Sequence, residues 1–533
     1  MQDDKWTDVA AEAEIEEGKT LKVEVDGEEI LLVRVKGRIH AFGNICTHHG
    51  GPLDEGLVVD STAPGINTGE EIVCPWHHAR FDLLTGRASG EPAVDDLPRY
   101  PVKVSAGRVH LNPALEPTWP ETGILSNQTF AVIGAGAAGS AAVETLRKEG
   151  FAGRLIQISA EDNLPYDRTH LSKRFLAGGM SVEQVFLYDH DFYERHGIDL
   201  MLGRRVTTLQ PGDKKLVFAD GESLEFDQAL IATGGVPRKL GFEGQELEGC
   251  FYLRSLADAG AISAAAAQAS QAVVIGAGFI GLEAASALLA RGLEVRVVAP
   301  EPAPMMTVFG ERIGQWLRAL HERNGVRFHL GETPTKITGD GRLRQVELSS
   351  GDRLQADMVV IGTGIVPVVD FLRESGLTEN GSLPVNERLQ TRADFVFAAG
   401  DIASVPDRRS GRRRRMEHWV EARRQGRKAA CSMLGIGSPF DEVPFFWTKQ
   451  HGVPLHYIGY APSVDRLAYR GNVEDGDFLA GYYLQGKLRA VAGVPRAREL
   501  IAMEDALRSG DTPSFEDFEN PRKALTARSP AAY

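Results

Sequence analysis

Residues 130–139 read Phe-Ala-Val-Ile-Gly-Ala-Gly-Ala-Ala-Gly. The four apolar residues predict a buried strand, and Gly134, Gly136 and Gly139 predict a tight turn into a helix. A second apolar strand follows at 155–158. Glycines in this position let the backbone approach a pyrophosphate, which binds at the positive end of the helix. The order of strand, turn, helix and strand therefore predicts an α/β dinucleotide-binding unit.

The same unit recurs later in the chain. An apolar strand at 272–275 leads into Gly276, Gly278 and Gly281, then a helix and a strand at 294–298. A single pattern of this kind could reflect small residues with a purely structural role. Two patterns, each set between predicted strands, predict two dinucleotide sites.

Three further apolar strands end in small-residue turns, at 230–234, 359–364 and 395–401. They place Thr233, Gly234, Gly364 and Asp401 at strand ends, as candidate cofactor-binding residues. The segments resemble those where two-dinucleotide flavoprotein reductases cross between domains. The resemblance implies a flavin domain at 127–243 and 367–440, a nicotinamide domain inserted at 244–366, and an α+β cap at 441–533.

Two short boxes each pair a cysteine with a histidine, Cys46-Thr-His48 and Cys74-Pro-Trp-His77. Two thiolates and two imidazoles are the ligands of a Rieske [2Fe–2S] centre. Structural zinc uses the same residue types, but its frameworks usually pair cysteine with cysteine and histidine with histidine. The flanks of both boxes resemble the ligand loops of Rieske ferredoxin domains. These four residues are therefore predicted to hold a [2Fe–2S] cluster.

The two boxes lie within residues 1–113, which predict a small all-β domain. Asp26-Gly27 separates two predicted strands in the pattern of a two-residue hairpin. Residues 60–69 read as a turn-rich insertion between the boxes, and the proline-rich residues 114–126 as a linker.

Two other histidines stand next to the predicted ligands. His49 and His78 have the wrong spacing to bind the cluster and are interpreted as neighbours of the ligands. His78 stands where Rieske ferredoxins usually have glycine. Its side chain must therefore point outward or crowd the cluster.

Length and composition indicate a multidomain globular protein. The chain has 533 residues and a net charge of −14, which argues against nucleic acid as a partner. It contains no apolar run long enough to span a membrane, and four cysteines and a polar N-terminus favour the cytoplasm. The basic run at 408–415 is interpreted as a solvated loop, or else as a docking site for an acidic electron-transfer partner.

Three longer motifs, at 165–173, 417–426 and 444–448, extend the resemblance to the whole chain. Together with the glycine patterns they resemble the ferredoxin reductases of bacterial oxygenase systems. They are closer still to apoptosis-inducing-factor-like reductases with an N-terminal Rieske domain. That family implies a multidomain fold in which an all-β Rieske domain precedes two Rossmann-like domains and an α+β cap.

The resemblance also implies residue roles. Arg168 and Lys173 would lie beside the isoalloxazine, and Lys173 would favour reduced flavin electrostatically. Asp401 would bind the ribityl chain, Glu283 would face the nicotinamide, and Trp447 would lie near the flavin ring. The alternative is a surface lysine, a glutamate on a helix face and a core tryptophan.

The chain departs from the family at two strand ends. Ser159 and Glu161 stand where an acid usually ends the second strand of the flavin unit. In the nicotinamide unit the position of the usual acid is not acidic, and Glu301 lies two residues beyond it. The standard place for an arginine that would bind a 2′-phosphate holds no arginine either. NADH is therefore favoured, with NADPH as the alternative.

The resemblance implies transfer of hydride from NAD(P)H to FAD, then of single electrons to the Rieske cluster and an external acceptor. The sequence leaves the acceptor open among a ferredoxin, an oxygenase component, a haem protein and a small molecule. Some relatives are homodimers, and the oligomeric state stays open. Two alternatives are a flavin-dependent disulfide or peroxide reductase, disfavoured because the chain has no Cys-x-x-Cys, and a redox sensor without sustained turnover.

Overall fold

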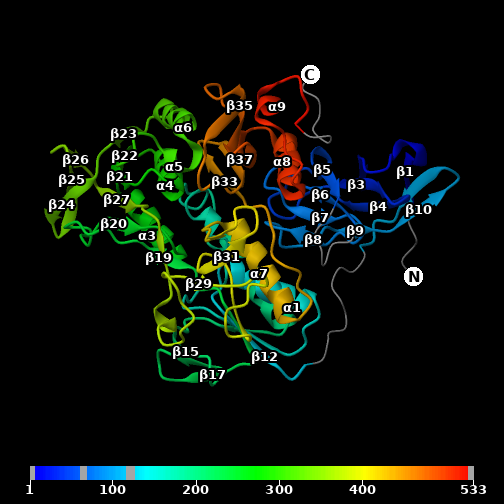
Figure 1. The fold of residues 1–533 in the computed structure, drawn as a ribbon, viewed down its shortest axis with the longest axis horizontal. Coiled ribbons are helices and arrows are strands. Elements are labelled where there is room, and N and C mark those ends of the chain that lie inside the picture. Colours follow the sequence, from blue (N-terminus) through cyan, green and yellow to red (C-terminus); the bar gives the residue numbers. More distant parts are fainter. Residues whose placement is uncertain (1–5, 61–68, 116–125, 526–533) are drawn as a thin grey trace.

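The computed structural model describes residues 6–60, 69–115 and 126–525 (Figure 1). Residues 61–68 of the predicted insertion and 116–125 of the predicted linker lie outside them. The predicted fold class is confirmed: an all-β N-terminal domain, two parallel-sheet α/β domains and an α+β C-terminal domain. Among the described residues, no helix is both long and apolar enough to cross a membrane.

The N-terminal domain is built from three small antiparallel sheets, ordered β2-β3-β4-β9, β1-β11-β10 and β5-β6-β7-β8. Their bounds are β1 Thr7–Ala11, β2 Thr20–Val25, β3 Glu28–Val35, β4 Arg38–Gly43, β5 Leu57–Asp60, β6 Glu70–Val73, β7 Arg80–Asp82, β8 Ala88–Gly90, β9 Arg99–Tyr100, β10 Val102–Ser105 and β11 Arg108–Leu111. At the predicted hairpin turn, Asp26 and Gly27 have φ of 52° and 86°, the geometry that joins twisted strands with two residues.

The first α/β domain has a parallel five-stranded sheet in the order β14-β13-β12-β18-β30. Its strands are β12 Thr129–Ile133, β13 Arg154–Ile158, β14 Ile198–Met201, β18 Gln228–Ile231 and β30 Val396–Ala398, with an antiparallel sheet of β15 Val206–Gln210, β16 Lys215–Phe218 and β17 Ser223–Glu225 beside it. Its helices are α1 Ala137–Lys148, α2 His190–Arg195 and α7 Trp419–Met433. Helices α1 and α7 approach each other closely at Gly426, which has no side chain. A Cβ atom there would overlap the carbonyl oxygen of Ala138.

The second α/β domain repeats this plan with a parallel sheet in the order β20-β27-β21-β22-β23. Its strands are β20 Cys250–Tyr252, β21 Gln271–Ile275, β22 Glu294–Ala299, β23 Arg327–Leu330 and β27 Met358–Ile361, with a small antiparallel sheet of β24 Pro334–Asp340, β25 Arg342–Leu348 and β26 Arg353–Gln355. Its helices are α3 Leu256–Ala266, α4 Phe279–Ala290, α5 Met306–Phe309 and α6 Glu311–Arg323. Ser255 caps α3 by accepting a hydrogen bond from the amide of Asp258.

The chain passes between the two α/β domains twice, and the two passages pair with each other. β19 (Gly235–Pro237) leaves the first domain and β28 (Ile365–Pro367) returns to it, and they form an antiparallel two-stranded sheet. The returning chain adds β29 (Leu383–Pro384), β31 (Ala403–Asp407) and β32 (Arg412–Arg414). The second domain is therefore an insertion in the first.

The C-terminal domain is an antiparallel sheet with two helices. Its strand order is β33-β34-β37-β36-β35, with bounds β33 Phe445–Gln450, β34 Val453–Gly459, β35 Arg466–Asn472, β36 Asp477–Leu484 and β37 Lys487–Val494. Helices α8 (Ala497–Ser509) and α9 (Phe515–Glu519) follow, and α8 lies between this sheet and the N-terminal domain (Figure 1). This domain therefore touches both the α/β part and the N-terminal part of the molecule.

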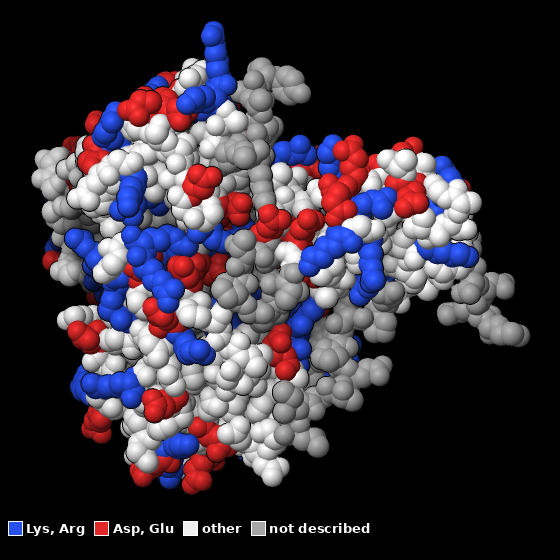
Figure 2. All heavy atoms as spheres, turned by 45° about the vertical axis from the view of Figure 1, so that its right-hand side comes forward, with Lys and Arg blue, Asp and Glu red and all other residues white. Residues whose placement is uncertain are grey.

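The basic run at 408–415 is largely neutralised within the molecule. Arg408 pairs with Glu387 and Arg409 with Asp441, each at 2.7 Å. Arg414 is buried and pairs with Asp407 at 3.1 Å. The face drawn in Figure 2 likewise shows positive and negative side chains interspersed. Several charges of the run are therefore paired within the molecule, while Arg408, Arg412 and Arg413 remain exposed to solvent.

Candidate functional site

A cleft of about 970 Å³ opens where the two α/β domains meet the C-terminal domain. Most of the residues predicted to bind cofactors line it: Gly134, Gly136, Ser159, Glu161, Arg168, Lys173, Thr233, Gly234, Gly278, Glu283, Gly364, Asp401 and Trp447. The other predicted residues lie outside its lining: Gly139, Gly276, Gly281 and Glu301.

The glycines outside the lining serve close packing. A Cβ at Gly139 would overlap the carbonyl oxygen of Gly134, and one at Gly281 would overlap that of Gly276. These positions let α1 and α4 begin against their strands. No side chain caps either helix, since Gly136 and Gly278 are the N-cap residues. The uncapped amides at both helix starts fit the pyrophosphate of a dinucleotide.

Glu161 is fixed by two neighbours at the flavin-unit end of the cleft. The hydroxyl of Tyr166 donates to it at 2.6 Å, and the guanidinium of Arg168 pairs with it. Burial alone would raise the pKa of Glu161, but the charge of Arg168 and the hydrogen bonds from Arg168 and Tyr166 together outweigh burial and lower it. The acid beyond the usual strand end is therefore an ionised carboxylate in the cleft, suited to accepting hydrogen bonds from ribose hydroxyls.

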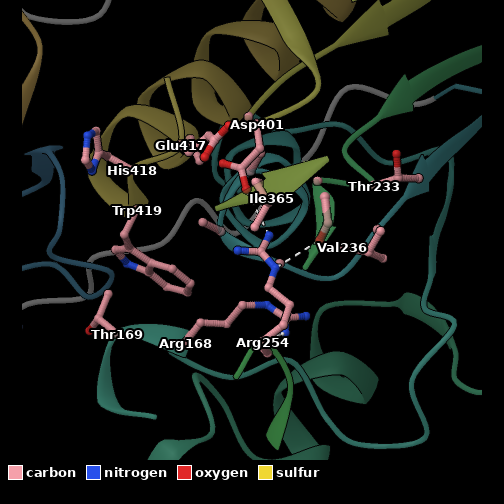
Figure 3. A pocket seen from close by; sticks show the side chains of 18 of the residues that line it. Arg168, Thr169, Thr233, Val236, Arg254, Ile365, Asp401, Glu417, His418 and Trp419 are labelled. Carbon is pink, nitrogen blue, oxygen red and sulfur yellow. Dashed lines mark hydrogen bonds and ion pairs between the residues drawn. The ribbon is translucent and has the colours of Figure 1, made fainter. Parts of the chain in front are cut away.

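Arg254 is a cleft residue that the sequence analysis did not identify (Figure 3). Its guanidinium donates to the carboxylate of Asp401 at 2.9 Å and to the carbonyl oxygen of Gly235 at 3.0 Å. Its own carbonyl oxygen accepts from Arg168 at 2.9 Å. Arg254 thus joins the insertion to both segments of the first α/β domain, and it orients Asp401.

The structure brings Lys173 and Glu283 together on the floor of the cleft. The ammonium of Lys173 lies 2.8 Å from Oε2 of Glu283, which is buried. Ser172 donates to the same oxygen at 2.5 Å, and Thr448 donates to Oε1 at 2.6 Å. Each carboxylate oxygen therefore has a hydrogen-bond donor, and the lysine is held beside the cleft by a fixed counter-charge.

The four predicted cluster ligands lie at the tips of two neighbouring loops. Cys46 and Cys74 are buried and unpaired by disulfides, and the rings of His48 and His77 lie 4.9 Å apart between centroids. The Cys46 thiol has a raised pKa because it contacts Cys74 and is buried. Two facing sulfurs beside two imidazoles form the donor set of a [2Fe–2S] cluster.

His48 and His77 are neutral imidazoles, the form that binds a metal. Burial lowers the pKa of His48 and of His77 well below the usual value, so both rings are neutral. Both ring nitrogens of His48 are buried with no protein hydrogen-bond partner among the described residues. Buried polar atoms are normally satisfied, so this orphaned imidazole fits a metal ligand. The backbone of Gly51 passes close to Sγ of Cys74. A Cβ atom at this position would lie only 2.8 Å from that sulfur, so a larger residue would crowd the ligand.

Trp447 connects the cluster site to the cleft. Its indole lines the cleft, and its ring centroid lies 4.7 Å from that of His77 and 6.1 Å from that of His48. Trp447 belongs to β33 of the C-terminal domain, so this domain supplies the wall between the two sites. Trp447 is therefore a side chain that lies against both predicted cluster histidines and also lines the cleft.

The glycine turns, the two parallel sheets and the cleft between them correspond to a known family. Residues 128–426 match the family model of pyridine nucleotide-disulphide oxidoreductases. The chain belongs to this family. Residues 5–101 match the Rieske [2Fe-2S] domain, and residues 445–528 match the reductase C-terminal domain. None of the four cysteines lines the described cleft, so this member of the family has no redox disulfide there.

Two similar proteins show how the parts combine. Apoptosis-inducing factor 3 of Homo sapiens is 34% identical over 525 residues, covering 94% of this chain and 85% of that protein. The ferredoxin reductase component of chlorobenzene dioxygenase from Cupriavidus sp. (strain PS12) is 34% identical over 398 residues, covering 74% of this chain and 97% of its own. The similarity to the first therefore extends well beyond the length shared with the second.

Solved structures agree with this assignment. The ferredoxin reductase for the CYP199A2 system from Rhodopseudomonas palustris superimposes with a TM-score of 0.73 at 31% identity, covering 76% of this chain and all of its own. The chain is an NAD(P)H-dependent FAD reductase of the ferredoxin-reductase type that carries its own Rieske [2Fe–2S] domain.

Several residues in or beside the cleft lacked a signal of their own in the sequence. Ser172 and Thr448 both donate to Glu283, although their positions differ by 276 residues. They lie within the motifs at 165–173 and 444–448, but those motifs did not indicate that either side chain binds Glu283. His418 stacks on Phe446 at 4.0 Å, and burial lowers its pKa to about 4. The sequence 417–426 pointed to this region through the family resemblance, without indicating which side chains enter the cleft.

Proposed function

We propose that electrons pass from the cleft to the Rieske cluster of the same chain and leave from that cluster to an external protein. When bound, FAD takes two electrons from NAD(P)H and releases them singly. The observation that carries the proposal is the position of Trp447, which contacts both cluster histidines and also lines the cleft. The chain therefore has the parts for an internal electron-transfer route.

The residue roles follow from the cleft. We assign the flavin to the side lined by Gly134, Glu161 and Asp401, and the nicotinamide dinucleotide to the side of Gly278. Glu283 and Lys173 stand where the two would meet, so Lys173 supplies positive charge to the flavin as it is reduced. Glu283 holds that ammonium in place by ion pairing. Its own side chain is buried beneath the part of the cleft that we assign to the nicotinamide.

We infer that NADH is the preferred reductant. β22 ends at Ala299, whose carbonyl oxygen accepts from the amide of Glu332 at 3.1 Å. Glu301, just beyond the strand, accepts from the amide of Gly331 through its carbonyl oxygen at 3.3 Å. Two carboxylate-bearing residues thus gather at the strand end that reads the ribose. Negative charge there disfavours a 2′-phosphate, so kcat/KM is expected to be higher with NADH than with NADPH.

The acceptor is proposed to be a ferredoxin or an oxygenase component, and to dock on the exposed side of the cluster. Ile45 and Trp76 are exposed by 47% and 46%, and each stands next to a cluster ligand. Exposed apolar side chains of this size are typical of interaction sites. A putidaredoxin reductase has been solved as a covalent complex with putidaredoxin. That reductase is 27% identical to this chain and superimposes on it with a TM-score of 0.70.

Two further features belong to the proposal. Cys250 and Cys431 are free thiols, which favours a reducing compartment such as the cytoplasm. A homodimer stays a prediction, to be checked by sedimentation of the holoenzyme.

Rapid mixing tests the proposed route. The anaerobic holoenzyme is mixed with NADH while flavin absorbance and the Rieske electron paramagnetic resonance signal are followed. Bleaching of the flavin should be followed by reduction of the cluster within one turnover, at a rate independent of protein concentration. A flavin that bleaches beside a cluster that stays oxidised would rule the route out. Turnover that stops after one reduction, with cytochrome c present, would instead favour a redox sensor.

A further inference from the structure

His78, the neighbour of ligand His77, is buried away from solvent in a conformation that favours glycine. Its φ is 59°, in the left-handed region, and its side chain has no exposed surface. Glycine adopts this conformation without cost, whereas a bulky residue there is uncommon and is retained when its surroundings require it. The side chain must therefore make contacts that compensate for its backbone conformation.

Those contacts are made with the C-terminal domain. The imidazole stacks on Phe445 of β33, with centroids 4.3 Å apart and planes at 9°. Nδ1 donates to Oε2 of Glu504, on α8, at 2.9 Å. The edge of the ring meets His456 of β34 at 5.7 Å. Of the two alternatives that the sequence left open, the side chain takes the outward one, into the neighbouring domain.

Glu504 gathers charges from three domains. Its Oε1 lies 3.2 Å from Arg80 of the Rieske domain, 3.2 Å from Arg424 of α7 and 3.4 Å from Arg508 of α8. The carboxylate is fully buried, so its charge depends on these partners. His78 adds the remaining hydrogen bond, on Oε2. A single side chain of α8 is therefore the point at which the cluster loop, the flavin domain and the C-terminal domain are joined.

Consecutive residues of the same loop thus face different targets. His77 points toward Trp447, while His78 enters the C-terminal domain beside it. The amide of His78 also donates to the carbonyl oxygen of Cys74 at 3.2 Å, which closes the ligand loop. Because Trp447 and Phe445 lie two residues apart on β33, anchoring His78 on Phe445 fixes His77 against Trp447.

We propose that His78 is a positioning residue that locks the second ligand loop onto the C-terminal domain, so that electrons enter the cluster from a fixed, docked arrangement. The proposal rests on the internal route described above. It adds that the rate of this step depends on a side chain that does not line the cleft and that contacts Phe445, His456 and Glu504 of the C-terminal domain.

The test compares His78→Gly with wild type in the full-length holoenzyme. His78→Gly relieves the backbone conformation while removing the stack and the hydrogen bond. Flavin reduction by NADH is expected to stay within twofold of wild type, and NADH-driven cluster reduction to slow at least tenfold. Iron content, the g-values and the midpoint potential of the cluster should not change. His78→Gln, which keeps a nitrogen donor for Glu504, should restore part of the lost rate.

Lys36→Gly is the matched control, because Lys36 is an exposed residue of the same domain with φ of 51°. It should leave both rates unchanged. Equal cluster-reduction rates in His78→Gly and wild type would overturn the proposal, as would altered g-values or lost iron in both His78 variants. If the wild-type cluster itself stays oxidised, the internal route fails before any variant is compared, so the two failures are distinguishable.

Discussion

The ammonium of Lys173 lies 2.8 Å from the carboxylate of Glu283, although the two belong to different α/β domains. Glu283 follows the second glycine turn on α4, and Lys173 follows the first unit. This pair therefore joins the two α/β domains at the point where we propose that the reactive ends of the two dinucleotides meet. Its geometry agrees with the roles that the family resemblance implied, and the following experiment tests those roles.

Lys173→Met is expected to slow flavin reduction by NADH about a hundredfold, because it removes the positive charge that stabilises the reduced ring. Glu283→Gln should slow the same step less, and the double variant should show non-additive effects because the two residues are in contact. Stopped-flow absorbance measures each rate. Lys19→Met is the control, since Lys19 pairs with Glu16 at the surface. An unchanged rate in Lys173→Met would contradict the assigned role.

Cys74→Ser is expected to remove iron and labile sulfide while leaving bound FAD in place, because the cluster and flavin sites lie in different domains. His49→Asn should keep the iron, although the ring centroid of His49 lies 3.7 Å from that of His48. Metal and sulfide analysis together with the flavin spectrum distinguish the two variants. Iron lost to the same extent from both would show that the ligand set is wrong, and zinc in place of iron would favour the alternative metal.

Arg254→Gln is expected to weaken FAD binding between about tenfold and a hundredfold, the usual worth of a hydrogen bond to a charged group. The reason is that Asp401 loses the guanidinium that orients it. Titration of the apoprotein with FAD gives the dissociation constant. Arg318→Gln, at an exposed pair with Glu322, should bind FAD normally. Unaltered affinity in Arg254→Gln would mean that Asp401 does not depend on this partner.

His321 predicts an acid-sensitive stability. It is buried, donates to Gln450 at 2.8 Å, and burial lowers its pKa from 6.5 to about 4. Between pH 6.5 and about 4, His321 is therefore protonated in the unfolded chain but neutral in the folded chain. The free energy of unfolding consequently falls as the pH decreases through this range. The loss from this one group approaches about 3 kcal/mol.

Urea unfolding between pH 4 and 7 measures that loss. His321→Gln keeps a hydrogen-bond donor for Gln450. Its free energy of unfolding should decline less steeply with decreasing pH than that of wild type, by a slope that corresponds to about one proton fewer taken up on unfolding. His190→Gln, at an exposed position of α2, should follow the wild-type curve. Parallel curves for His321→Gln and wild type would disprove the assignment.

The sequence predicted those features that depend on local spacing. The glycine turns located both dinucleotide sites, because tight turns and close packing at Gly139 and Gly281 permit little else. The cysteine–histidine boxes likewise indicated a Rieske domain, which the family match at residues 5–101 confirms. Arg254 escaped notice because its partner Asp401 is 147 residues away and no motif links them. The direction of His78 stayed open because it is decided by Phe445 and Glu504, in a domain that starts more than three hundred residues later.

The paired passages β19 and β28 limit how the nicotinamide domain can move. Each passage alone would act as a free tether, but Val236 is in register with Val366, and the strands are bonded side by side. A ribbon of two strands bends across its face more readily than it slides along its length. We therefore expect any movement of the nicotinamide domain relative to the flavin domain to be a tilt about this ribbon rather than a slide along it.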